Sequence, residues 1–160
     1  LGTLELLLTS PVKDWEIVMG KYLASTVILI STLLCTFFYV ILISIYSTPD
    51  FGPLLSAYLG IILYGIATLG VGVFASSLSS NQIVSAVVGI VILLLLSFLD
   101  SLGAMLEGIP STIFNEIALN YHYGDFTKGV IDIRNIVYYL STASVFLFFT
   151  IVILQMRRWR

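Results

Sequence analysis

Charged residues are scarce in this chain of 160 residues. Lysine, arginine, aspartate and glutamate make up only 10% of it, whereas 59% of the residues are hydrophobic and the mean hydropathy is +1.07. So few charges cannot cover the surface of a globular domain of this size in water. The composition therefore argues against a buried soluble core and indicates a protein embedded in a lipid bilayer.

The residues that bind metals or form disulfides are nearly absent as well. Cys35 is the only cysteine, so one chain can form neither a disulfide framework nor a thiolate metal site, and we expect Cys35 to be a packing residue. The sequence contains no HExxH, CxxC or Walker A motif. No basic cluster is large enough to follow a nucleic-acid backbone. We predict no metal, no cofactor and no nucleic-acid partner.

A catalytic role would have to depend on His122, the only histidine, with Asp125 and Ser111 nearby. A histidine and an aspartate at this spacing arise readily by chance, and nothing marks Ser111 as a nucleophile on a strained turn. Asp125 and Asp132 fall in a loop segment. Contact of their carboxylates with water is a sufficient reason for charged residues at these positions. We therefore predict no catalytic residues and an interfacial position for His122.

Four windows are long and apolar enough to approach the about 20 residues that a transmembrane helix needs; they cover residues 22–46, 54–76, 83–99 and 136–154. None of them contains an ionisable Asp, Glu, Lys, Arg or His, each of which would oppose insertion; a charge at the helix centre costs about 2.5 to 3.5 kcal/mol. We predict an all-α integral membrane fold in which residues 1–160 form a single transmembrane domain. Ion-coupled carriers usually hold ionisable residues at membrane depth, so these spans offer no site for a coupling ion.

The basic residues suggest how the chain is oriented. Four spans place both ends on one side of the membrane, and that side carries Lys13, Lys21, Arg157, Arg158 and Arg160, while Lys128 and Arg134 lie on the other. The positive-inside rule then predicts that both ends of the chain are cytosolic and that the protein is a multi-pass component of the cell's inner, cytoplasmic membrane.

Residues 1–20 precede the first span and have the pattern of a contact helix. Leu4, Leu7 and Leu8 recur at helical spacing while Glu5 and Thr9 face elsewhere, which gives a short helix one apolar edge. Pro11 disfavours helix at the residue before it and so ends this helix. The apolar edge fits either a protein partner in the cytosol or the lipid surface.

The segment between the third and fourth windows, residues 100–135, is the one long outer loop. Ile113, Phe114, Ile117 and Tyr121 would share one face of a helix that begins after Pro110. Such a helix suits the membrane interface or a re-entrant position in the outer leaflet. We predict outer interfacial or re-entrant helices here.

Small residues recur along the second and third windows. Spacing of four residues places them on one stripe of a helix, where another helix can approach closely. We predict a role in helix packing for Thr68, Gly72, Ser76, Ser85 and Gly89.

Two motifs together resemble a known family. The first is GTLELLLTSPV at residues 2–12, followed by DWEIV at 14–18 and GK at 20–21; the second is DFTKGVID at 125–132. They resemble the ABC-2 type permeases, which are the membrane subunits of ATP-driven ABC exporters. The likeness is greatest to the branch described as gliding-motility-associated, and the motifs are also similar to the copper-processing permeases of denitrification clusters.

The resemblance implies a permease of six spans with its main coupling helix between the second and third. The spans visible here would be the third to sixth, in a chain truncated at its N-terminus. The resemblance assigns ATPase coupling to Gly2, Thr3, Leu4, Glu5, Leu7, Leu8, Thr9 and Pro11. It implies as partners an ABC ATPase subunit and a second permease subunit, in a homodimer or heterodimer, with no enzymatic activity in this chain. The alternative is a structural or force-transmitting subunit of an envelope or gliding machinery that passes no substrate.

Overall fold

The computed structural model describes residues 13–158, and within them all regular structure is helical. The helices are α2 (Asp14–Tyr46), α3 (Phe51–Leu78), α4 (Gln82–Met105), α5 (Ile109–Ile117), α6 (Leu119–Thr127) and α7 (Ile133–Arg158). In this part of the chain α2, α3, α4 and α7 are long and apolar enough to cross a membrane. The prediction of an all-α membrane fold with four such helices is confirmed.

Residues with short polar side chains cap the N-termini of several of these helices. The Asp50 side chain accepts a 3.1 Å hydrogen bond from the Gly52 amide at the start of α3, and the Asn81 side chain accepts a 2.9 Å bond from the Ile83 amide at the start of α4. At the start of α7 the Asp132 side chain accepts from the Arg134 amide. Each of these bonds satisfies an amide that has no partner within its helix, so the polar connections fix where the apolar helices begin.

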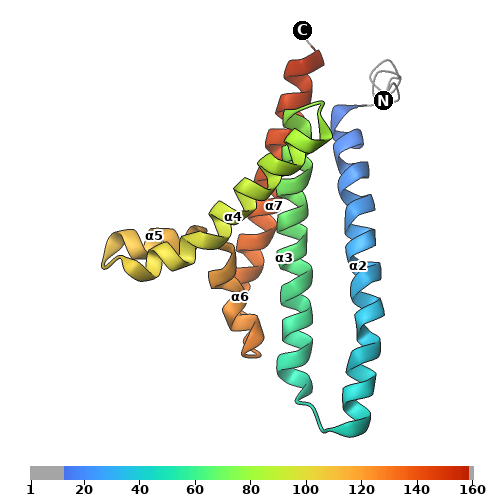
Figure 1. The fold of residues 1–160 in the computed structure, drawn as a ribbon, viewed down its shortest axis with the longest axis vertical. Helices are drawn as coiled ribbons and strands as arrows, with labels where there is room; N and C mark the ends of the chain where they lie inside the picture. The colour runs from blue at the N-terminus through green and yellow to red at the C-terminus, as the bar shows by residue number, and fades with distance from the viewer. Residues whose placement is uncertain (1–12, 159–160) are drawn as a thin grey trace.

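Helix α3 lies at the centre of the bundle, with α2, α7, α4 and α6 packed around it. At one end of the bundle α2 begins, α3 ends, α4 begins and α7 ends (Figure 1); this is called the terminal end below. The opposite end contains the connection between α2 and α3. Helices α3 and α7 run in the same direction and α2 runs against them.

Two buried clusters hold the bundle together. The cluster toward the terminal end joins α2, α3 and α7 through Val18, Tyr22, Val73, Ala143 and Leu147. The second joins α3, α6 and α7 through Leu63, Ala67, Leu119, Phe126 and Tyr139. Since α2 contributes only to the first cluster, its main attachment lies near the terminal end.

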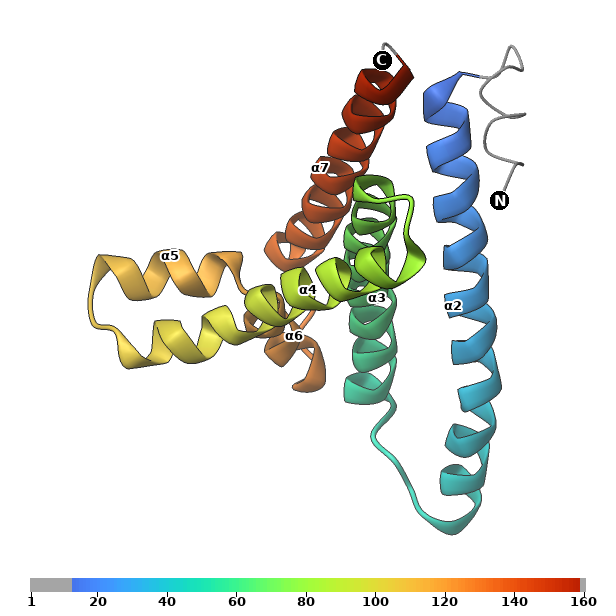
Figure 2. The same ribbon diagram turned by 45° about the horizontal axis from the view of Figure 1, so that its top comes forward.

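Helix α4 leaves the bundle obliquely, and α5 folds back along it, so that the two form an arm at one side of α3 (Figure 2). The arm is closely packed at Gly103, where an added Cβ would clash with the Asn115 side chain on α5. Large apolar side chains cover the outer surface of α4, among them Ile83, Val87, Leu94 and Phe98.

The segment that follows Pro110 differs from the single helix that the sequence predicts. Helix α5 starts at Ile109, with a proline in its first turn, but the chain becomes extended at Ala118 and α6 begins at Leu119. The break is explained by contacts from α7, because the Tyr138 hydroxyl donates to the main-chain oxygen of Ile117 and the Tyr139 hydroxyl donates to that of Leu119. A continuous helix would have placed Ala118 and Leu119 elsewhere; here both are fully buried.

Candidate functional site

The terminal end of the bundle contains the contacts that join α2 to the helices behind it. The Lys21 ammonium on α2 donates a 2.7 Å hydrogen bond to the Ser76 hydroxyl on α3. One residue further on, the Tyr22 hydroxyl donates a 3.0 Å bond to the main-chain oxygen of Ile66. Val18, which is 2% exposed, packs in the same cluster. These contacts, with the one described next, are called the terminal junction.

Helix α7 joins the terminal junction through Arg157. The guanidinium of Arg157 donates a 2.8 Å hydrogen bond to the main-chain oxygen of Leu78, the last residue of α3. The last carbonyls of a helix lack partners within it and form the negative end of its dipole, so a cation is stabilising there. A cavity of about 130 Å³ lies between the three helices and is lined by residues that include Lys21, Ser76, Thr150 and Arg157. Both cations are thus held on the same end of α3.

A larger cavity lies between α3 and α4, next to the junction. Its volume is about 540 Å³, and it is lined by Lys21, Gly72, Ala75, Ser76, Gln82, Ser85, Ala86, Gly89, Ile90 and Leu93. Among the described residues that line it, Lys21 is the only charged one. We call this space the α3–α4 cavity.

A second hollow lies deeper along α3. Ile61, Tyr64, Asn120 and Tyr123 line a cavity of about 260 Å³ between α3 and α6. The Tyr64 hydroxyl donates to Asn120 Oδ1 over 3.3 Å, and Asn120 Nδ2 donates to the main-chain oxygen of Ser97 over 3.1 Å. Ile61, Tyr64, Gly72 and Ala75 fall on one face of a helix with 3.6 residues per turn. The two cavities therefore follow the same face of α3.

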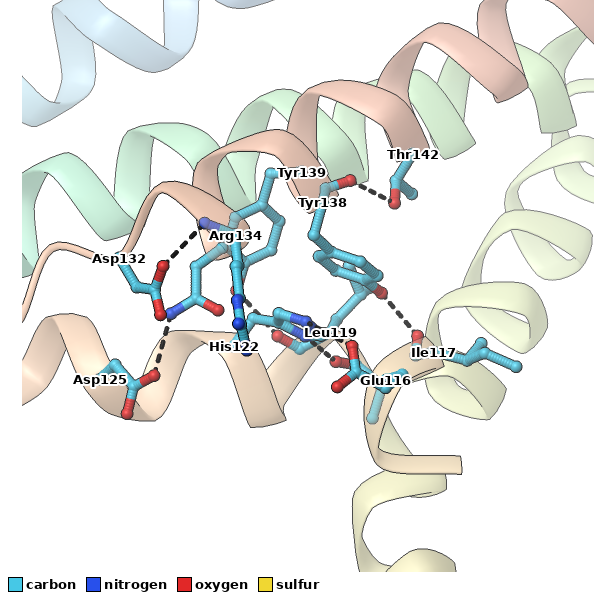
Figure 3. A network of polar contacts seen from close by, with 12 residues as sticks. Glu116, Ile117, Leu119, His122, Asp125, Asp132, Arg134, Tyr138, Tyr139 and Thr142 are labelled. Carbon is cyan, nitrogen blue, oxygen red and sulfur yellow. Dashed lines mark hydrogen bonds and ion pairs between the residues drawn. The ribbon is translucent and has the colours of Figure 1, made fainter. Parts of the chain in front are cut away.

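The contact between α6 and α7 contains a buried polar cluster (Figure 3). The imidazole of His122 lies parallel to the Tyr138 ring, with 3.8 Å between ring centroids and 2° between planes. Its Nδ1 is 3.2 Å from the main-chain oxygen of Ala118, and its Nε2 is 3.7 Å from the Glu116 carboxylate. The break at Ala118 turns α6 into the bundle and leaves His122 only 4% exposed. Its position at the membrane interface stays a prediction.

Asp125 and Asn135 form a second contact in this cluster. Asn135 is 5% exposed, and its Nδ2 donates a 3.0 Å hydrogen bond to Asp125 Oδ2. The contacts of Asp125 with Asn135 and of His122 with Tyr138 thus hold α6 against α7, and the contact of His122 with Glu116 joins α6 to α5. Among residues 13–158 no three His, Cys, Asp or Glu side chains gather as a metal site would require.

The residues for which the sequence predicts ATPase coupling, Gly2 to Pro11, lie outside the described residues. Of the predicted packing residues, Ser76 binds Lys21, Thr68 donates to Gly65 of its own helix, and Ser85 is buried and donates to Ser79. An added Cβ at Gly89 would lie 3.2 Å from the Ala75 side chain, whereas one at Gly72 would meet nothing within 4 Å. The role of this stripe in packing stays a prediction.

Close approaches also occur at three glycines that the sequence analysis missed. An added Cβ would lie 2.7 Å from Phe126 at Gly60, 2.4 Å from Leu29 at Gly65 and 3.1 Å from Ala143 at Gly70. A spacing of five residues turns a helix by more than one full turn, so these glycines point to different sides of α3. They face α6, α2 and α7 in turn. The spacing of five residues between these glycines was the signal in the sequence that α3 has neighbours on several sides. A search for small residues repeated every four positions does not detect it.

The helical bundle, its apolar outer surface and its membrane-length helices define a multi-pass membrane protein. The chain belongs to the ABC-2 family of transporter proteins, because the model of that family matches residues 1–156. It is 32% identical over 147 residues to a probable multidrug ABC transporter permease, YbhR, of Escherichia coli strain K12 and, to the same extent, to its counterpart in Escherichia coli O157:H7. The match covers 90% of this chain but only 37% of each of those relatives. No solved structure matches the chain.

Proposed function

We propose that the chain is part of the membrane-spanning permease subunit of an ABC transporter, and that it couples ATP hydrolysis by a separate ATPase subunit to the export of a substrate. Membership of the ABC-2 family and similarity to proteins named as ABC transporter permeases support this role. The four apolar helices provide the membrane-embedded part that such a subunit needs.

The terminal junction is the observation that carries the coupling role. Helix α2 begins at Asp14, directly after the segment whose leucines would contact the ATPase. Lys21 and Tyr22 then bond α2 to α3, and Arg157 bonds α3 to α7. A displacement at the start of α2 would therefore move the ends of all three helices together and shift the permease between inward-open and outward-open states.

The proposed orientation places the terminal end in the cytosol and the protein in the inner membrane. Lys13 and Lys21 lie at the start of α2 and Arg157 at the end of α7, so the basic residues gather where the positive-inside rule requires them. In this orientation residues 2–10 face the ATPase, and Leu4, Leu7 and Leu8 form the contact.

A second permease subunit completes the proposed assembly, as a homodimer or a heterodimer. The α4–α5 arm supports this proposal because α4 carries exposed apolar side chains such as Val91 and Leu95 on a helix that projects from the bundle. In a bilayer these side chains face either lipid or the second subunit, and both are compatible with an ABC exporter.

The resemblance to the gliding-motility-associated branch leaves a second role open, in which the subunit transmits force and passes no substrate. The α3–α4 cavity and the separate hollow deeper along α3 favour transport over this role, because transport needs space for a substrate and force transmission does not. Transport assays separate the two roles.

The test uses the full-length protein, reconstituted with its ATPase subunit in sealed vesicles. Transport predicts ATP-dependent movement of a fluorescent amphiphilic solute and its loss when Leu4, Leu7 and Leu8 are changed to Asp. If ATP hydrolysis depends on these leucines but no solute moves, the result would instead support force transmission. Hydrolysis that is indifferent to the leucines would overturn the coupling role.

A further inference from the structure

We propose that the α3–α4 cavity binds an anionic amphiphile from the cytosolic leaflet, with its acidic head group on Lys21 and its hydrocarbon part along α3. This inference depends on the proposed function, because it names the class of substrate that the permease would accept. Two features of the cavity support it: the charge of its rim and the apolar character of its walls.

The rim of the cavity carries the positive charge of Lys21. The Lys21 ammonium has three donors, and the hydrogen bond that the structure gives it goes to the neutral Ser76 hydroxyl. Lys21 therefore retains donors for a phosphate or carboxylate head group, and the Gln82 amide lines the same cavity. A cationic ligand would meet repulsion here.

The remaining walls are mostly apolar, which distinguishes an amphiphile from a free anion. Ala75, Ala86, Ile90 and Leu93 line the cavity with hydrocarbon surface. Its volume of about 540 Å³ lies within the range of about 300–1,000 Å³ that is typical of small-molecule sites. A free phosphate would use only the charged rim, whereas a lipid head group on Lys21 places its chains against these walls.

A separate hollow lies on the same face of α3, further toward the opposite end of the bundle. Ser76 and Ile61, which line the two spaces, are about 22 Å apart along α3 at about 1.5 Å per residue, more than half of a hydrocarbon core of about 30 Å. Tyr64 and Tyr123 line this deeper hollow. Hydrocarbon extending from a head group at Lys21 along this face would pass from the apolar walls of the cavity toward these aromatic rings.

Gly72 lines the α3–α4 cavity at an open part of its wall. Gly72 is exposed, and a Cβ added there would meet nothing within 4 Å. A large side chain at this position would therefore extend into the space that the amphiphile is proposed to occupy.

The experiment uses the full-length protein with its ATPase subunit in phosphatidylcholine vesicles that contain a photoactivatable phosphatidylglycerol. After irradiation, mass spectrometry identifies the labelled peptides. We expect label on the α3 and α4 residues of the cavity, competed by unlabelled phosphatidylglycerol and not by a cationic lipid of the same chain length. Competition by inorganic phosphate as strong as that by the lipid would overturn the proposal of a lipid site.

Five variants separate charge, space and folding. Lys21→Gln should reduce cavity labelling about tenfold, which corresponds to about 1.4 kcal/mol, because it removes a charge-assisted hydrogen bond, and Lys21→Arg should restore it. Gly72→Leu should block labelling, while Gly124→Leu, at a second glycine with open space around its Cβ, should not. Ser76→Ala removes the junction bond but keeps the charge, so it should retain labelling. Equal labelling of Lys21→Gln and the unchanged protein would overturn the inference.

The outcomes also distinguish this inference from the proposed function. A complex that hydrolyses ATP and moves solute, but shows no cavity labelling, keeps its role as a permease and contradicts the anionic substrate. Specific cavity labelling in a complex whose hydrolysis ignores the cytosolic leucines supports the lipid site and contradicts the coupling role.

Discussion

The Tyr22 hydroxyl on α2 donates a 3.0 Å hydrogen bond to the main-chain oxygen of Ile66, in the middle of α3. Tyr22 is 8% exposed, so the bond lies in the cluster that joins α2, α3 and α7. A hydrogen bond within an otherwise apolar contact fixes the position of one helix along the other. Apolar packing alone fixes that position less strictly. Tyr22 therefore holds α2 in register with the central helix.

Tyr22→Phe removes this hydrogen bond and keeps the ring. We expect a loss of about 0.5–1.5 kcal/mol in stability, and a larger loss of transport than of ATP hydrolysis, because α2 would move without carrying α3. Thermal unfolding in detergent and transport in vesicles measure the two effects. Tyr39→Phe is the matched control, since Tyr39 is on the same helix and 65% exposed. Equal effects of the two changes would contradict the role of Tyr22.

Gly60→Ala tests the close approach of α6 to α3. The new Cβ would lie 2.7 Å from Phe126 Cβ and 2.8 Å from its Cγ, which are not the flexible end of that side chain. Overpacking of this kind costs about 1–3 kcal/mol, so the unfolding temperature should fall. Gly72→Ala introduces the same methyl group on the same helix where nothing lies within 4 Å. It should be tolerated or slightly stabilising, because alanine is a better helix former than glycine, and similar destabilisation by both changes would contradict the close contact with Phe126 as the cause.

His122 is expected to act as a packing residue. His122→Phe keeps an aromatic ring on Tyr138 and should retain most of the stability, whereas His122→Ala removes the ring and should cost about 3 kcal/mol or more, by analogy with other large-to-small changes in cores. Both unfolding temperature and ATP hydrolysis should be measured. A His122→Phe protein that folds normally but has lost all activity would point to chemistry at the imidazole and contradict this expectation.

The contact between Asp125 and Asn135 predicts that changing both residues costs less stability than the sum of the two single changes. Asp125→Ala leaves the Asn135 amide buried without its partner, at a cost of about 1–3 kcal/mol. Asp125→Ala combined with Asn135→Leu removes both polar groups and should be less destabilising than the sum of the single changes. A double-mutant cycle by chemical denaturation measures the coupling, and strictly additive effects would show that the bond contributes nothing.

The sequence predicts the membrane helices well because long apolar runs determine them almost alone. The starts of α3 and α4 are local features too, since Asp50 and Asn81 stand directly before these helices and accept hydrogen bonds from amides of their first turns. These features depend on neighbouring residues in the chain. No distant contact is needed to infer them.

The features that the sequence did not predict depend on distant contacts. The break at Ala118 follows from hydroxyls on α7 that bind main-chain oxygens about twenty residues earlier in the chain. The burial of His122 follows from that break. The sequence predicts that Lys21 and Arg157 lie on the same side of the membrane, but their bonds to the end of α3 require the relative positions of three helices.

The central claim is that the segment before α2 contacts an ATPase subunit in the cytosol. The direct measurement is cross-linking in sealed vesicles of the full-length complex, with Cys35→Ser and a single cysteine at Leu7. The account predicts a cross-link from position 7 to the ATPase subunit, whose yield changes when ATP is added, and protection of that cysteine from a membrane-impermeant thiol reagent outside intact cells. Labelling of position 7 from outside intact cells, without a cross-link to the ATPase, would contradict it.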